Sequence, residues 1–557
     1  MNRRNFIKTT GLSLAAALLY DPLFASSGLA KNQLITLPDE VYAVYNNKTV
    51  QLTGISKELV GYDEILVFFE NTGTGVSVSI QAPHIALDSI TLRWKLPIKS
   101  TSKVLNDHWE RSYGDLGWKN AKEMEILPWY FMEYNKSGTS GFGVKTGANA
   151  FCYWVIYDGK LNLTLDTRSG GNGVQLLSRK LKAAEIVSIK SDSGESPFQT
   201  ARRFTKLMCD KPRMPKQPVY GINDWYFSYG NTSADLIFDH TQRMAPMADG
   251  LSNRPFSVID SGWFVGPPDN PDDCCWGDMS KPEESFKDMY GVASKIKNIG
   301  MRPGIWTRPL CGSVDDNVSL LLPNYNGNDK RRPVLDPSIP ENLERIKSYI
   351  KLYKEWGFEL VKFDYTSFDI FKRFGAEMIK SGSVPAQNWT MYNVNKTNAE
   401  IVLNLYKAIR EAAGDTYIIG CNTFSHLSAG LFELNRIGDD TSGQDWSRTK
   451  KMGVNTLAFR GIQHGNFYSA DADCVGLTDK IPWSKNKQWM ELLAKSGTPL
   501  FISAQPGVAG ADQKEFIKKC FSLASQNLPL GEPLDWMETP TPKKWKLNNE
   551  VETFNWD

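Results

Sequence analysis

The first 200 residues are dominated by short runs in which apolar and polar residues alternate. Residues 65–70 and 161–166 are two such runs, and Gly, Asn, Asp and Ser separate them from their neighbours. Alternation with a period of two places every second side chain on one face of a strand. The pattern from about residue 35 to 200 therefore predicts an all-β domain, most simply a sandwich.

The pattern changes near residues 209–215, after which strands alternate with amphipathic helical stretches such as residues 342–356 and 398–413. Eight segments have strand character, namely residues 219–227, 255–260, 301–307, 360–365, 417–422, 435–440, 466–471 and 499–504. Eight strands within about 290 residues predict a (β/α)8 TIM barrel. An open doubly wound sheet is the alternative, but no Gly-rich phosphate-binding motif follows any of these strands.

The region after the barrel is short and contains a helical stretch followed by strand-like residues 545–547. It is too short to build an independent core. The expected organisation is therefore multidomain: a β-sandwich over residues 31–214, a catalytic barrel over 215–510, and a C-terminal helix and β remnant over 511–557.

The N-terminal residues 1–30 resemble a twin-arginine signal peptide. Arg3 and Arg4 precede an apolar stretch at residues 12–19, and small residues follow at 25–30. A basic, frayed terminus is the alternative interpretation. The apolar stretch is shorter than the roughly 20 residues that span a bilayer, so no stable membrane insertion is expected. We expect a mature protein that begins near Lys31 and is exported to the periplasm or beyond.

Composition narrows the possible partners. With 64 Lys and Arg against 62 Asp and Glu, the net charge of +2 offers no excess of cations for a nucleic acid backbone. The 17 Trp, 21 Tyr and 27 Phe favour a carbohydrate partner only mildly, because most aromatic residues form core. Eight scattered Cys and five His do not form a metal-binding pattern. The sequence leaves the oligomeric state open.

Polar and aromatic residues crowd the predicted carboxyl ends of the barrel strands. They include Asp224, Trp225, Asp260, Trp306, Lys362, Asp364, Cys421, Arg436, Asp439, Asp440, Asp471 and Asp473. A single Asp at such a position usually caps a helix. Catalytic groups of TIM barrels also lie at these ends, and glycoside cleavage needs two carboxyl groups beside the scissile bond. Acids at several strand ends therefore favour a glycoside hydrolase.

Two of these strands resemble the α-galactosidase clan, glycoside hydrolase families 27 and 36. Residues 361–365 (Val-Lys-Phe-Asp-Tyr) resemble its nucleophile strand, which implies that Asp364 is the nucleophile and that Lys362 binds ring hydroxyls. Residues 436–440 (Arg-Ile-Gly-Asp-Asp) resemble its acid/base strand. The spacing from Arg436 implies that Asp440, and not its neighbour Asp439, is the acid/base.

Further motifs in the same order extend the resemblance to about residues 100–505. Residues 224–226, 304–307, 420–421 and 496–500 are similar to strands one, three, five and eight of the clan. They imply that Trp225, Trp306 and Cys421 line the sugar site, together with Asp260 and Arg436. A β domain before the barrel is typical of the melibiase-like family 36. Residues 108–111 of that domain either reach over the barrel mouth or form an ordinary surface loop.

The resemblance implies a retaining exo-glycosidase that hydrolyses terminal α-galactosidic linkages without a metal or organic cofactor. Two departures stand out: Ser261 follows Asp260 where the clan has paired acids, and its C-terminal β domain is nearly absent. The missing acid leaves an α-N-acetylgalactosaminidase or a β-L-arabinopyranosidase as alternatives. A catalytically silent carbohydrate-binding protein is a third interpretation.

Overall fold

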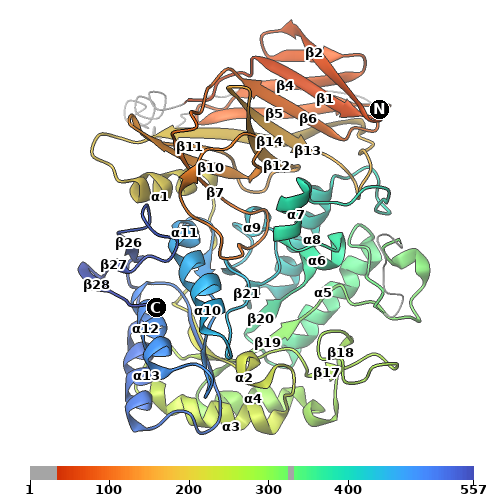
Figure 1. Cartoon of the computed structure of the whole chain (residues 1–557). Coiled ribbons are helices and arrows are strands. Elements are labelled where there is room, and N and C mark those ends of the chain that lie inside the picture. Colours follow the sequence, from red (N-terminus) through yellow and green to blue (C-terminus); the bar gives the residue numbers. More distant parts are fainter. Residues whose placement is uncertain (1–33, 324–331) are drawn as a thin grey trace, which may run out of the picture.

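The computed structural model describes residues 34–323 and 332–557 of the chain. Figure 1 shows a β-rich N-terminal part above a mixed part in which helices surround a parallel sheet. The predicted signal peptide, residues 1–30, lies outside the described residues. Within the described ranges, no helix is long and apolar enough to cross a membrane.

The N-terminal part forms one antiparallel sheet, ordered β8-β7-β10-β11-β14-β5-β4-β3-β2-β1-β6-β13-β12-β9. Its strands are β1 (Glu40–Tyr45), β2 (Lys48–Ser56), β3 (Leu59–Tyr62), β4 (Ile65–Asn71), β5 (Gly75–Ala82), β6 (Ser89–Trp94), β7 (Lys103–Asn106), β8 (Lys119–Asn120), β9 (Leu127–Pro128), β10 (Tyr130–Asn135), β11 (Gly138–Val144), β12 (Phe151–Tyr157), β13 (Lys160–Asp166) and β14 (Leu177–Lys190). Alternate residues of β4 are buried, as its sequence pattern predicts.

The two halves of this sheet pack against each other. Trp154 on β12 contacts Phe131 on β10 and Phe142 on β11, which belong to the other half. Trp94 on β6 joins the same aromatic cluster. The expectation of a large sheet-rich N-terminal region is therefore confirmed.

The second part contains a parallel sheet in the order β23-β22-β21-β20-β19-β16-β15-β25-β24. Its strands are β15 (Tyr220–Asn223), β16 (Phe256–Ile259), β19 (Arg302–Thr307), β20 (Leu360–Phe363), β21 (Tyr417–Gly420), β22 (Leu434–Arg436), β23 (Ser469–Asp471), β24 (Cys474–Leu477) and β25 (Leu500–Ala504). Only Ala472 and Asp473 separate β23 from β24, which lie at opposite ends of the strand order. The sheet therefore curls into a TIM-like arrangement. Each predicted strand segment contains or overlaps one of these strands, although residues 225–227 are helical.

Helices and short hairpins connect and cover these strands (Figure 1). The helices are α1 (Pro197–Met208), α2 (Trp225–Ser228), α3 (Ala234–Met244), α4 (Met289–Ile299), α5 (Pro340–Glu355), α6 (Thr366–Phe371), α7 (Gly375–Ser381), α8 (Asn398–Ala413), α9 (Ser425–Ser428), α10 (Trp446–Thr449), α11 (Thr456–Arg460), α12 (Trp483–Lys495) and α13 (Ala511–Ala524). Short 3-10 or π turns are η1 (Ala245–Ala248), η2 (Glu284–Phe286), η3 (Val318–Leu320), η4 (Lys450–Asn455) and η5 (Gly461–Gln463), and β17 (Phe264–Val265) pairs with β18 (Asp278–Pro282). The predicted helices at 342–356 and 398–413 correspond to α5 and α8.

The C-terminal residues form a small three-stranded sheet of β26 (Glu532–Pro533), β27 (Lys544–Leu547) and β28 (Glu550–Thr553). It follows α13, and β27 contains the strand-like residues noted in the sequence. Trp556 is fully buried, and the indole of Trp446 donates a hydrogen bond of 2.8 Å to its carbonyl. This segment is therefore packed against the barrel helices.

Candidate active site

The carboxyl ends of the parallel strands surround a small cavity. Its walls are Trp225, Asp260, Ser261, Cys275, Trp306, Lys362, Asp364, Tyr365 and Asp440. Six of the eight residues predicted from the sequence are thus on one cavity wall. The other two, Cys421 and Arg436, are buried and contact each other at 3.6 Å.

Asp364 lies directly after β20, where the strand stops and the chain turns into α6. Its backbone N–H donates to the Thr307 carbonyl of the neighbouring strand at 3.0 Å, which fixes the position of the residue. The carboxylate accepts a hydrogen bond of 2.7 Å from the N–H of Tyr365 and a long one of 3.4 Å from the indole of Trp306. Both contacts leave lone pairs of the carboxylate available on the cavity side.

Tyr365 has a left-handed backbone, with φ of 62°. Such a conformation costs a non-glycine residue roughly 1–3 kcal/mol, so neighbouring contacts must maintain it. The Arg308 guanidinium lies 3.9 Å from the centroid of the Tyr365 ring, and it is itself ion-paired to the fully buried Asp369 at 2.6 Å. This stack holds the turn that carries Asp364.

Lys362 and Asp260 form an ion pair at the base of the cavity. Lys362 Nζ is 2.8 Å from Asp260 Oδ2, which also accepts from the Asn223 amide at 2.6 Å. Burial alone would lower the pKa of Lys362, but the charge of Asp260 raises it well above its usual range. The neighbouring Asp224 is buried, and burial together with the charge of Asp260 raises its pKa to about 6. The cavity therefore keeps one fixed cation near Asp364.

Ser261 is on the cavity wall, but its hydroxyl donates to the carbonyl of Cys274. The adjacent Cys275 also lines the cavity, and the two sulfur atoms are 3.5 Å apart. No acid follows Asp260 at this edge, so the wall is less charged than one built from two carboxylates.

Asp439 and Asp440 have different surroundings although they are adjacent. Asp439 is held between two arginines, with Arg111 at 2.7 Å and Arg448 at 2.8 Å. Asp440 reaches the cavity and its side chain remains 39% exposed, with Arg436 at 3.2 Å and Arg111 at 3.6 Å. Burial raises the pKa of Asp440, but the charges of Arg111 and Arg436 outweigh this effect and hold it below its usual value.

Arg436 lies behind the cavity wall and is almost fully buried. Its guanidinium contacts Asp473 at 2.9 Å as well as Asp440, and Asp473 also accepts from the hydroxyl of Tyr226. Cys421 lies between Arg436 and Arg111, and burial raises the pKa of its thiol well above the usual range. Arg436 therefore orients Asp440, and Cys421 is a protonated packing group within this cluster.

Arg111 comes from the N-terminal β region and not from the barrel. Ser112 forms a β-bridge with Gly438, and this bridge brings the segment 108–111 to the acid/base strand. The sequence left the role of residues 108–111 open, because the residues around Arg111 carry no pattern that separates an arginine contacting the barrel from one on an ordinary surface loop. Asp473 was among the acids expected at the strand ends and Tyr365 belonged to the nucleophile motif, but the sequence assigned a supporting role to neither.

In the described part of the chain, no group of three or more His, Cys, Asp or Glu residues could hold a metal ion. The cavity is lined by three carboxylates, those of Asp260, Asp364 and Asp440, together with one lysine and two indoles. Carboxylates can exchange protons or attack an electrophilic carbon, and indole faces pack against the C–H faces of a sugar ring.

Comparison with known proteins agrees with this geometry. An α-galactosidase of Escherichia coli is 31% identical over 163 residues, which are 28% of this chain and 22% of that protein. An α-galactosidase of Thermus thermophilus, solved with p-nitrophenyl α-D-galactopyranoside, has a TM-score of 0.57 at 15% identity and covers 92% of this chain and 98% of its own. The chain is related in sequence to an α-galactosidase and shares the family 36 fold. No protein-family model matches it.

Other solved structures show how widely this fold is used. The family 36 α-galactosidase AgaA of Geobacillus stearothermophilus has a TM-score of 0.53 at 12% identity, covering 86% of this chain and 67% of its own. A family 31 sulfoquinovosidase of E. rectale has a TM-score of 0.54 at 12% identity, and the match covers 93% of this chain and 87% of its own. Because the sequence match spans about a fifth of the E. coli protein, the activity must be argued from the site.

Proposed function

We propose that the chain is a retaining exo-glycosidase that hydrolyses terminal α-galactosidic linkages, with Asp364 as nucleophile and Asp440 as acid/base. The observation that carries this proposal is the placement of both carboxylates on one small cavity with Trp225, Trp306 and Lys362. The exo mode of action is taken from the resemblance of residues 361–365 and 436–440 to the α-galactosidase clan.

The arrangement suits a double displacement. Asp364 attacks the anomeric carbon while Asp440 donates a proton to the departing oxygen, and Asp440 then takes a proton from the water that releases the sugar. Such a pair of carboxyl groups is expected about 5–5.5 Å apart. Lys362 donates to ring hydroxyls, and Trp225 and Trp306 form aromatic walls.

Two comparisons support the choice of sugar. The T. thermophilus enzyme was also solved with stachyose. A variant of the G. stearothermophilus enzyme AgaA was solved with raffinose.

A second candidate follows from Ser261. Its hydroxyl donates a hydrogen bond to the Cys274 carbonyl. Because Ser261 follows Asp260, the edge of the cavity there lacks a second acid. This favours a broader sugar preference, including an α-N-acetylgalactosaminidase or a β-L-arabinopyranosidase on the same scaffold. The catalytic pair is common to all these activities.

A panel of p-nitrophenyl glycosides separates the candidates. We expect the highest kcat/KM for the α-galactoside, with product NMR showing an initial α-anomer. An inverted first product would exclude the retaining scheme. Absence of turnover on the whole panel would favour a carbohydrate-binding protein.

The nucleophile is tested by Asp364→Ala. We expect turnover to fall below detection with the thermal unfolding temperature nearly unchanged, because Asp364 borders a cavity and not the packed core. Added azide should then yield a glycosyl azide of inverted configuration. An azide product of retained configuration would exclude Asp364 as the nucleophile.

We also propose export of the protein by the twin-arginine route, and this rests on the sequence of residues 1–30 alone. Replacement of Arg3 and Arg4 by Lys should retain the precursor inside the cell. Unchanged export of that variant would contradict the proposal.

A further inference from the structure

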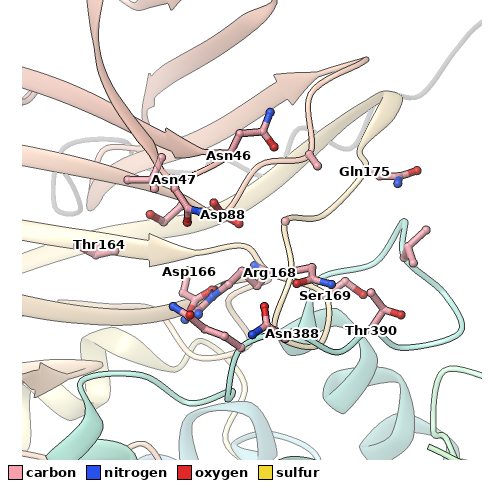
Figure 2. A pocket seen from close by; sticks show the side chains of 18 of the residues that line it. Asn46, Asn47, Asp88, Thr164, Asp166, Arg168, Ser169, Gln175, Asn388 and Thr390 are labelled. Atoms are coloured by element: carbon pink, nitrogen blue, oxygen red, sulfur yellow. Dashed lines mark hydrogen bonds and ion pairs between the residues drawn. The ribbon is translucent and has the colours of Figure 1, made fainter. Parts of the chain in front are cut away.

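A second, larger cavity lies between the β region and the connection from α7 to α8 (Figure 2). Its volume is roughly 560 Å³, within the range of small-molecule binding sites. Five chain segments build it: the end of β1 with the β1–β2 turn, the residues leading into β6, Tyr153 on β12, β13 with the residues after it, and residues 387–394. It shares no lining residue with the cavity that contains Asp364.

The walls carry many hydrogen-bonding groups that the fold does not use. Asn46, Asn47 and Asp88 lie on the upper side in Figure 2, and Asn388 and Thr390 on the lower side. Within the described residues, no hydrogen bond engages the side chain of any of the amides, which are Asn46, Asn47, Asn172, Gln175, Gln387 and Asn388. Amide groups donate and accept at once, which is what recognition of neutral hydroxyl groups requires.

The floor of the cavity is firmly held. Arg168 donates to the Ser383 hydroxyl at 2.7 Å, and the N–H of Gln175 donates to the Val394 carbonyl at 3.0 Å. Gly170 and Asn398 exchange two hydrogen bonds of 2.7 Å each. A preformed floor lowers the ordering cost of binding.

The charges of the cavity exclude several classes of ligand. Arg168 is neutralised by its ion pair with Asp166, and Asp88 adds an unbalanced negative charge. Anionic polymers and phosphates are therefore disfavoured. Two carboxylates fall short of a metal site, and most of the lining residues are polar, which does not favour the apolar anchors of a peptide. Tyr153 adds a partly exposed ring on which a sugar could pack.

We propose that this cavity is an accessory binding site for a neutral oligosaccharide, such as the chain that carries the terminal sugar to be cleaved. The choice of carbohydrate rests on the proposed function, whereas the cavity and its free polar groups do not. Asp88 and the amides of Asn388 and Gln175 bind the sugar hydroxyls. The site retains a polymeric substrate and leaves hydrolysis of small substrates unaffected.

Affinity gel electrophoresis with galactomannan tests this site. The full chain with Asp364→Ala is used so that the polymer is not consumed. We expect galactomannan to retard this protein in the gel. A second substitution, Asn388→Ala, should raise the dissociation constant about fivefold. Asp88→Asn in its place should raise it about tenfold, because the charge-assisted hydrogen bonds of Asp88 are stronger. Asn549→Ala is the matched control, since Asn549 is exposed with φ of 70° against 67° for Asn388; it should change nothing.

A second readout separates this inference from the catalytic one. With Asp364 intact, Asn388→Ala and Asp88→Asn should keep the native kcat/KM on p-nitrophenyl α-galactoside and lose rate only on galactomannan. The proposal of an accessory site would be overturned if galactomannan did not retard the protein, or if it retarded all variants equally. Equal retardation by polygalacturonate would overturn its preference for neutral chains. Failure of the proposed activity would show as no hydrolysis of either substrate by the native protein, with binding unaffected.

Discussion

At the residue scale, the two adjacent aspartates after β22 show how surroundings assign different roles to identical side chains. Asp439 is saturated by Arg111 and Arg448, whereas Asp440 faces the cavity with Arg436 behind it. We expect Asp440→Ala to lower kcat/KM by about 10²–10⁴ for poor leaving groups and far less for dinitrophenyl glycosides, which need little protonation. The measurement is a series of leaving groups of graded pKa.

Asp439→Ala is the matched control for that series. It removes an ion-pairing partner from two arginines, so it should lower the thermal unfolding temperature. It should also lower kcat/KM by a similar factor for every substrate in the series. If only Asp439→Ala produced leaving-group dependence, the assignment of Asp440 as acid/base would be wrong.

The low pKa of Asp440 leads to a prediction about pH. A proton donor must be protonated in the free enzyme, so kcat/KM falls as pH rises through the pKa of Asp440. Arg111 lies 3.6 Å from this carboxylate and holds its pKa down. Arg111→Gln should therefore raise that pKa and shift the basic limb of the pH profile upward by roughly one unit.

Arg111→Lys keeps the charge and serves as the control for this shift. Its basic limb should stay close to that of the native protein. A basic limb that did not move in Arg111→Gln would show that another group controls it.

Much of this residue-scale arrangement could be predicted from the sequence. Asp364 and Lys362 share one strand, as do Arg436 and Asp440, so spacing alone places them. Arg111 could not be predicted in the same way, because its partners are over 300 residues away in the chain. The left-handed turn at Tyr365 also has no sequence signal, since the contacts that sustain it come from Arg308.

At the scale of elements, the helices with clear periodicity were the most predictable. The predicted helix at residues 398–413 coincides with α8, where Thr397 and Glu400 form a capping box. For the seventh barrel strand, the predicted residues 466–471 contain β23 but not β24. This strand is split into β23 and β24 around Asp473, whose φ of 73° interrupts the run that a pattern search would follow.

The cap of α8 gives a prediction about stability. Thr397 Oγ1 accepts from the Glu400 N–H at 3.1 Å and donates to the Asn149 carbonyl at 2.6 Å. Thr397→Ala should cost about 1 kcal/mol and lower the unfolding temperature by about 1–2 °C. Thr397→Ser keeps the oxygen and should be nearly neutral. Differential scanning calorimetry measures both, and an unchanged temperature in Thr397→Ala would contradict the role of the cap.

At the scale of the whole molecule, the β region and the barrel are joined through buried polar contacts. The clearest is the ion pair of Asp107, which follows β7, with Arg460 at the end of α11, at 2.8 Å and with both side chains fully buried. Gln463 also donates to Asp107 at 2.9 Å. The chain leads from Asp107 to Arg111 within four residues, so this pair anchors the segment that reaches Asp440.

Asp107→Ala would leave the Arg460 charge buried without its partner. Such a loss costs about 3–5 kcal/mol, so we expect a clearly lower unfolding temperature and a loss of activity as the segment carrying Arg111 loosens. The double variant Asp107→Leu with Arg460→Met should recover most of the stability, because an apolar pair of similar size needs no charge compensation. Calorimetry and kcat/KM on the same samples test both effects. If Asp107→Ala lowered stability no more than a change at the exposed Asp269, the two parts of the molecule would be held together by their apolar contacts instead.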